Sequence, residues 1–292
     1  MTDRYELECM GETVVIERTD DGETIFHGWD RETEEAWVAM GGEPSACFIA
    51  WNAIQHDILD ESLIAQSGTG NAAAIAALLF LGADASTDDS EAMYVAAEHQ
   101  HVAVIRLLAD AGADVNVSEG FPLAHAVSKS NYDMAQTLID LDATMVIDDD
   151  PSLLLQAVHR HDPAMIRLLF EADYDPSCGD DQGLVSAAID GSIDTLDLIL
   201  EAGAPRSNNF EDALTGAAQW GHIHIVERLI DAGADIQQQG GDALAVAAEN
   251  GREEMVNFLL DHGVQVSSEA INAAIESRHH AIASTLVDRA GR

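Results

Sequence analysis

The chain has 292 residues, of which 47% are hydrophobic, enough for one large domain or two smaller ones. Its 53 acidic and 13 basic residues give a net charge of −40, and Lys129 is the only lysine. Nucleic acid is therefore excluded as a partner, because phosphate binding requires clustered Lys and Arg. No apolar run reaches the roughly 18 residues that a membrane span needs.

Two further features of composition concern the compartment. The N-terminus is polar and acidic, unlike a secretory signal peptide. The three cysteines, Cys9, Cys47 and Cys178, are odd in number and lack the spacing of metal ligands. This usage favours a reducing interior without a disulfide framework. We therefore expect a cytoplasmic protein with no metal and no cofactor.

The acidic charge has two possible explanations. One is adaptation of a halophilic protein to a cytoplasm at molar salt, where the Debye length falls to about 3 Å and self-repulsion is screened. The other is a functional acidic surface that blocks a basic partner by mimicking nucleic acid. Acidic residues occur in every segment and lysine is almost absent throughout, which favours salt adaptation.

Residues 1–60 predict a small β-rich segment followed by a helix. Alternating strands are expected at Thr13–Glu17 and Thr24–His27, on either side of a turn at Asp20–Gly22. Tyr5–Cys9 is a candidate third strand and Trp37–Met40 a fourth. Gly41 to Pro44 then interrupts the chain before a helix over residues 45–59.

The rest of the chain contains an internal repeat. A short loop motif recurs at intervals of 30 residues, with one interval of 31, beginning at Gly82, Gly112, Asp142, Asp173, Gly203, Gly233 and Gly263. An apolar pair lies just upstream of these loops, as in Leu229-Ile230. A pair of alanines, as in Ala217-Ala218, lies about eleven positions before that. A recurrence of this length indicates a stack of supersecondary units.

Each unit predicts two helices. In the sixth, Asp212 is a candidate N-cap, and the small Ala217 and Ala218 allow helices to approach closely. Residues 222–230 have apolar side chains at helical spacing. Gly233 suits the C′ position, where the backbone is left-handed, and Asp142 and Asp173 are tolerated there in its place.

The repeat resembles the ankyrin (ANK) family. Residues 121–127, Phe-Pro-Leu-Ala-His-Ala-Val, are similar to the family signature Thr-Pro-Leu-His-x-Ala-Ala, and residues 217–235 are similar to the rest of its unit. The resemblance covers about residues 61–292. It implies a mainly α-helical solenoid of about eight helix-turn-helix repeats that functions in protein binding. We expect repeats to start near 61, 91, 121, 152, 182, 212, 242 and 269.

This assignment gives residues 1–60 two possible roles. They form either a cap that shields the first repeat or a recognition module of their own, and the general need of solenoids for caps favours the first. The repeats have 30 residues where the family has about 33. We therefore expect short fingers, as the turns that precede each repeat are called, and more recognition by helix surfaces.

No set of residues predicts catalysis. The twelve histidines include His101 and His222, which follow the inter-helix turn, where ankyrin repeats have polar residues that hydrogen-bond across the loops. The pairs His99/His101 and His222/His224 lack a third ligand for zinc. The glycine-rich Ser67–Gly70 lacks the lysine of a phosphate loop. We therefore expect no enzyme.

The family resemblance places a binding groove along the fingers and the last two residues of each first helix, which we call the helix-end surface. In this chain it includes Lys129, Arg160, Ile189 and Trp220, with His99 and His159 in the same column. Arg and Trp are common binding hot spots. The finger residues Phe121, Tyr174 and Phe210 are expected to extend it. The alternative is that Trp220 packs on the next repeat and the cations pair locally.

Two other functions remain open. An acidic inhibitor would use finger carboxylates, namely Asp88, Asp89, Asp148, Asp149, Asp150, Asp180, Asp181, Glu211 and Asp212. A structural subunit would associate through the last repeat, although Arg278, His279, His280, Asp288 and Arg289 make that end polar enough for a cap. The sequence gives no oligomeric state beyond a slight preference for a monomer.

Salt adaptation predicts that stability depends on salt. Helicity and the melting temperature should rise from millimolar to molar KCl, because screening removes the repulsion among 53 carboxylates. Circular dichroism melts across that range measure both quantities. A chain that melts at the same temperature throughout would contradict salt adaptation and favour the acidic inhibitor.

Overall fold

The computed structural model describes the chain except residues 1–2, 10–11, 20–22, 32–33, 36–37, 39–43, 57, 145–151, 205–209 and 292. The chain forms two compact units, Met1–Met145 and Val146–Arg292, called here the N-terminal and C-terminal units. The predicted turn at Asp20–Gly22, the aspartates Asp148–Asp150 and most of the predicted strand Trp37–Met40 lie outside the described residues. Val38, which belongs to that segment, is helical.

The N-terminal unit begins with an antiparallel sheet in the order β1-β2-β3. Its strands are β1 (Asp3–Cys9), β2 (Glu12–Arg18) and β3 (Thr24–His27), and α2 (Ala46–His56) follows. Val14 and Ile16 are buried, whereas Val15 between them and Glu17 after them are partly exposed. This period of two is the one that predicts strands from the sequence, and the three predicted strands are confirmed.

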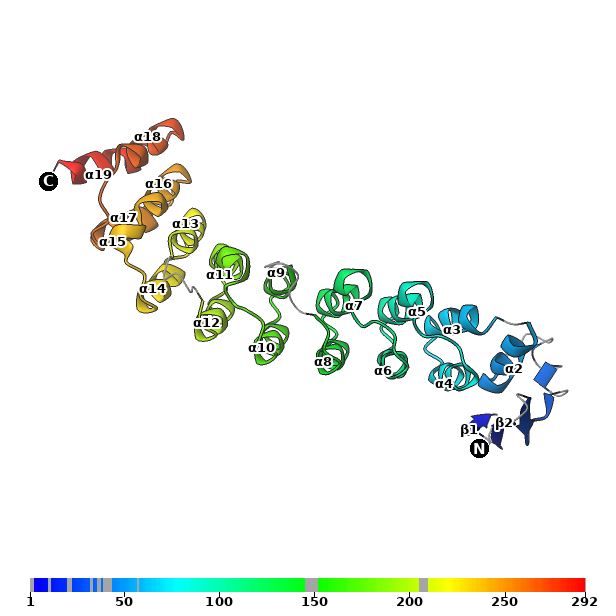
Figure 1. Ribbon diagram of the computed structural model, residues 1–292. Helices are drawn as coiled ribbons and strands as arrows, with labels where there is room; N and C mark the ends of the chain where they lie inside the picture. Colours follow the sequence, from blue (N-terminus) through cyan, green and yellow to red (C-terminus); the bar gives the residue numbers. More distant parts are fainter. Residues whose placement is uncertain are drawn as a thin grey trace. The chain divides into compact units, whose positions relative to one another are not determined.

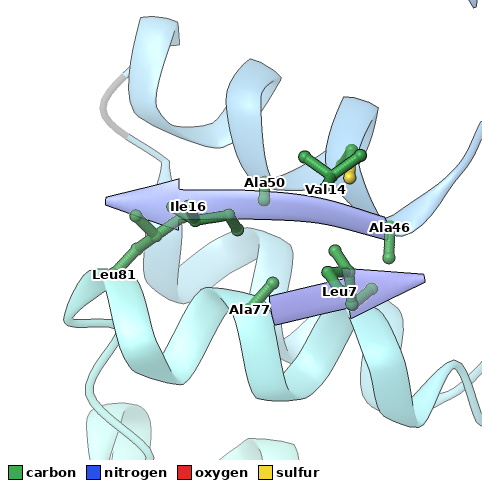
Figure 2. Close-up of a cluster of buried hydrophobic side chains, with 9 residues drawn as sticks. Leu7, Val14, Ile16, Ala46, Ala50, Ala77 and Leu81 are labelled. Atoms are coloured by element: carbon green, nitrogen blue, oxygen red, sulfur yellow. The ribbon is translucent and has the colours of Figure 1, made fainter. Parts of the chain in front are cut away.

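The sheet and α2 share one core with the first repeat (Figure 2). Leu7, Val14 and Ile16 of the sheet pack with Ala46 and Ala50 of α2 and with Ala77 and Leu81 of α4 (Ala72–Leu81). Outside this core, Tyr5 stacks on Phe80 of α4 with ring centroids 5.4 Å apart. Burial raises the pKa of the Tyr5 hydroxyl. The segment thus covers apolar side chains of the first repeat, the contact expected of a cap.

Cys47 of α2 is buried in this core and disulfide-bonded. The expectation of a chain without disulfides was therefore wrong. An odd number of cysteines leaves one unpaired, but it does not prevent the others from pairing when packing brings them together.

Eight pairs of helices follow, as the repeat predicts (Figure 1). The N-terminal unit contains three pairs: α3 (Leu59–Ser67) with α4, α5 (Thr87–Glu98) with α6 (Val102–Asp110), and α7 (Val117–Ser128) with α8 (Tyr132–Asp140). The C-terminal unit contains five pairs: α9 (Ser152–His159) with α10 (Pro163–Glu171), α11 (Cys178–Asp190) with α12 (Ile193–Glu201), α13 (Glu211–Trp220) with α14 (Ile223–Asp231), α16 (Gly241–Glu249) with α17 (Glu253–Asp261), and α18 (Ser268–Glu276) with α19 (His280–Ala290). The short α15 (Ile236–Gln239) lies in a finger.

The loops after the second helices have the predicted left-handed backbone. Gly233 has φ +109°, and Asp142 and Asp173, which replace glycine, have φ +60° and +64°. Aspartate adopts this conformation more readily than most residues, which explains its presence there. The predicted N-cap is off by two positions, because α13 begins at Glu211 and its cap residue is Phe210.

First helices of neighbouring repeats lie directly against one another within each unit, as α11, α13, α16 and α18 do (Figure 1). Alanines make this approach possible: Ala217 and Ala218 of α13 and Ala247 and Ala248 of α16 are fully buried. Small side chains let helix axes come close together, and the buried apolar area stabilises the stack. The ends of the first helices are left at the surface.

Candidate functional site

In three repeats the residue after the inter-helix turn ties that repeat to the preceding one. His101 Nε2 donates to the carbonyl oxygen of Gly68 at 3.0 Å, and His222 Nε2 donates to that of Ile189 at 3.1 Å. Arg252 Nε donates in the same way to Gln219, also at 3.0 Å. In all three cases donor and acceptor are 33 positions apart. The predicted structural role of His101 and His222 is confirmed.

Other members of this column cap their own second helix. The side chains of Asn71, Asn131 and Asp162 each accept a hydrogen bond from the backbone N–H three residues later, at 3.1 Å. These bonds satisfy one of the N–H groups that a helix leaves without a partner at its N-terminus. Members of the column therefore have structural roles in both units.

The residues predicted for the helix-end surface are divided between the two units. Lys129, the C-cap of α7, belongs to the N-terminal unit, with His99 at the end of α5. Arg160, Ile189 and Trp220 belong to the C-terminal unit, at the ends of α9, α11 and α13. All five side chains are exposed.

Trp220 is the most exposed tryptophan among those whose burial is described, with 52% of its surface accessible. Ile189, one repeat earlier, is 37% exposed and packs partly against Gly216 of α13. Trp220 borders residues of the next repeat, yet about half of its surface stays accessible to solvent. Two large apolar side chains remain open to solvent on successive first helices of one unit.

A depression of about 580 Å³ lies beside Trp220. Its wall includes Arg252, Glu253, Glu254 and Met255, at the start of α17 in the next repeat. The family resemblance points only to the fingers and the ends of first helices, so it does not predict that the start of α17 belongs to this site. The sequence feature that could have predicted it is the acidic pair Glu253-Glu254, which directly follows Arg252 after the inter-helix turn.

Two predicted members of the surface do not belong to it, and two others contact neighbouring side chains. Tyr174 and Phe210 are buried, with 2% and 3% of their surface exposed, so the prediction that they extend the surface was wrong. Phe121 is partly buried and stacks on Tyr94 at 4.3 Å. His159 Nε2 lies 2.9 Å from the hydroxyl of Ser186 in the next repeat, so this histidine also connects repeats.

The fingers contain a second column of carboxylates with a local role. Asp84, Asp114 and Asp175 each accept the backbone N–H of the residue two positions later, at 2.8 to 2.9 Å. The Ser86 hydroxyl also donates to Asp84, and these hydrogen bonds hold the pKa of Asp84 below its ordinary value. These aspartates shape the turn, as Asp commonly does at such positions.

The other finger carboxylates of the N-terminal unit face one depression of about 720 Å³, and Asp114 also contributes to its wall. Its lining includes Asp88, Asp89, Glu91 and Glu119, all exposed. No group of three His, Cys, Asp or Glu side chains within the described ranges has a geometry that would hold a metal ion.

The family model for ankyrin repeats matches residues 62–149, 154–240, 184–270 and 214–291. The chain therefore belongs to the ankyrin-repeat family, whose repeats generally mediate protein–protein interaction and typically have no catalytic activity of their own. No curated protein matches the chain. None of the helices in the described part is long and apolar enough to cross a membrane.

The contact between His222 and Gly191 gives a testable prediction. Gly191 has φ +68°, and a Cβ there would lie 2.8 to 2.9 Å from the His222 ring. Gly203, with φ +105°, has no atom within 4 Å of that position. Gly191→Ala should therefore lower the free energy of unfolding by about 1 kcal/mol more than Gly203→Ala, since both strain the backbone but only the first clashes.

The double variant separates the two causes. His222→Ala alone should cost about 1 kcal/mol for the lost hydrogen bond. In that background Gly191→Ala should cost no more than Gly203→Ala, because the ring is gone. Urea unfolding in molar salt, followed by circular dichroism, measures all five proteins including the wild type. Strictly additive losses at Gly191 and His222 would contradict the contact.

Proposed function

We propose that this protein binds a protein partner through the helix-end surface of its C-terminal unit. The observation that supports it is the exposure of Trp220 and Ile189, together with the depression beside Trp220. Tryptophan contributes more than most residues when it is buried in an interface, and here 52% of the Trp220 surface is still accessible to a partner.

The surroundings of Trp220 favour a particular partner chemistry. Glu253 and Glu254 line the depression, and the chain has a net charge of −40. Arg252, the cation on the same wall, already donates to the Gln219 carbonyl. A partner segment with an apolar or aromatic anchor next to Lys or Arg would bury Trp220 and meet these carboxylates. Arg160 lies two repeats away on the helix-end surface, where it would be a second anchor that binds an acidic group of the partner.

Substitution of the anchors tests this function. Partners captured from extract in molar salt by the wild-type chain should be lost on Trp220→Ala and weakened on Arg160→Ala, by at least about 1 kcal/mol, or fivefold in affinity. Tyr132→Ala is the matched control, because Tyr132 is 44% exposed but lies on a second helix of the other unit. Smaller losses at both Trp220 and Arg160 would refute the surface.

A second candidate function is supported by the acidic depression of the N-terminal unit. Asp88, Asp89, Glu91 and Glu119 converge on it, as a surface that blocks a basic protein requires. Repulsion among these groups has no evident benefit to the fold. Here the finger carboxylates, rather than Trp220, would bind the partner.

The inhibitor predicts a different pattern of loss. A basic partner should bind the wild-type chain and weaken steeply as salt rises, and Asp88→Asn with Asp89→Asn should reduce its affinity about tenfold. Asparagine tolerates the positive φ of these two positions, so the fold is preserved. The control is Asp110→Asn with Asp133→Asn, exposed carboxylates of second-helix turns. Binding that persists unchanged in molar salt would exclude the inhibitor.

A further inference from the structure

The sheet of the N-terminal unit has an open edge. In the order β1-β2-β3, β3 pairs with β2 alone among the described strands, so backbone groups along its other side are available. Open edges are usually guarded by Lys, Pro, a bulge, inward-pointing charge or a very short strand. The strand reads Thr-Ile-Phe-His, so its length of 4 residues is the only one of these guards that it has, and Ile25 is 39% exposed.

A groove runs along this edge, with a volume of about 340 Å³. We call it the edge groove and define it by Ile25 and Phe26 of β3, Trp29 and Arg31 after the strand, and Trp51 and Ile54 of α2. The rings form a continuous apolar wall: Phe26 to Trp29 is 5.4 Å and Trp29 to Trp51 is 6.0 Å between centroids.

A buried carboxylate fixes this wall in place. Trp29 Nε1 donates to Glu34 Oε2 at 2.6 Å, and the backbone N–H of Ser45 donates to the other Glu34 oxygen, also at 2.6 Å. Glu34 is only 1% exposed. A buried polar group is costly unless it is hydrogen-bonded, and here one oxygen holds the Trp29 ring at the groove while the other accepts from the Ser45 backbone. The groove is therefore formed before any ligand arrives.

Arg31 places a positive charge at the rim. Its guanidinium lies 5.2 Å from the centre of the Trp51 ring, and its side chain is 50% exposed. Its ion pair with Glu35 is 3.5 Å long, between two side chains that are 50% and 42% exposed. Solvent weakens such a pair, so Arg31 can exchange Glu35 for a carboxylate of a ligand at little cost.

We propose that the edge groove binds an extended segment of another protein, which pairs with β3 as a fourth strand, inserts a large apolar side chain between Ile25 and the aromatic wall, and places an Asp or Glu against Arg31. Main-chain hydrogen bonds to the open edge supply affinity, and the pocket and Arg31 supply specificity. A second copy of this chain fits less well, because each copy has a net charge of −40. The site lies outside the ankyrin repeats and is independent of the helix-end surface.

Peptide selection on the full-length chain tests the proposal. Random phage-displayed peptides about eight residues long, enough to span a strand, are selected on the wild-type chain in molar salt. Selected peptides should share a large apolar residue near an Asp or Glu. Two versions of a selected peptide are then made, one methylated at its odd-numbered and one at its even-numbered backbone nitrogens. Only alternate N–H groups of an added strand face β3, so one version should lose binding and the other should keep it.

Variants then assign the site. Ile25→Lys should weaken selected peptides at least about tenfold, because a charge replaces an apolar side chain of the groove, whereas Ile275→Lys, at a more exposed isoleucine of α18, should have no effect. Arg31→Glu should weaken them similarly and Arg31→Lys much less. Exchanging the peptide carboxylate for an amide should remove the difference between wild type and Arg31→Glu. Trp220→Ala should leave peptide binding unchanged, so failure here is distinct from failure of the helix-end surface.

Three outcomes would overturn the proposal. Selection yields no peptide whose binding depends on Ile25, or selected peptides bind the Ile25→Lys chain as well as the wild type. The third outcome is that the wild-type chain forms a dimer in the absence of peptide and that Ile25→Lys makes it a monomer. This would show that the edge of β3 pairs with a second copy of the chain.

Discussion

A pair of short helices cannot bury its own apolar face, and the fold depends on the contact between neighbouring repeats that this imposes. Buried alanine pairs such as Ala217 and Ala218 let the first helices lie against each other. The hydrogen bonds of His101 and His222 connect the loops at one end of those helices. Stacking uses the sides of each helix pair, so only helix ends and fingers are left for recognition. Trp220 is open to solvent for this reason.

The few basic residues show the same constraint. Arg106 donates to Thr137 at 2.8 Å, and Arg228 and Arg289 pair with Asp197 and Asp261, in each case in a neighbouring repeat. Each bond at this partly exposed surface contributes at most about 1 kcal/mol. Their common placement nonetheless offsets repulsion between second helices that carry many carboxylates. Lys129, by contrast, forms no ion pair with the described residues and sits where the end of α7 favours a positive charge.

Most of the repeat architecture could be predicted from the sequence, because the features that define it are local. A left-handed loop residue, a small-residue pair and an apolar period of 3.6 each appear within one repeat. The burial of Tyr174 and Phe210 could not be predicted, since periodicity does not tell whether a finger side chain turns towards the neighbouring repeat. The edge groove was missed for a related reason. Trp29 and Trp51 meet only when α2 packs on the sheet, and neither lies in a recurring pattern.

The bonds between repeats have an evolutionary consequence, because their acceptors are backbone carbonyl groups. Gly68, Ile189 and Gln219 accept from His101, His222 and Arg252, three acceptors with no side-chain chemistry in common. Every residue has a backbone carbonyl group. When a repeat is duplicated, deleted or exchanged, the donor side chain therefore finds an acceptor in the preceding repeat without a compensating substitution there. The array can therefore lengthen or shorten by whole units while each new junction forms its bond at once. Side chains at the helix ends, such as Trp220, are then free to diversify.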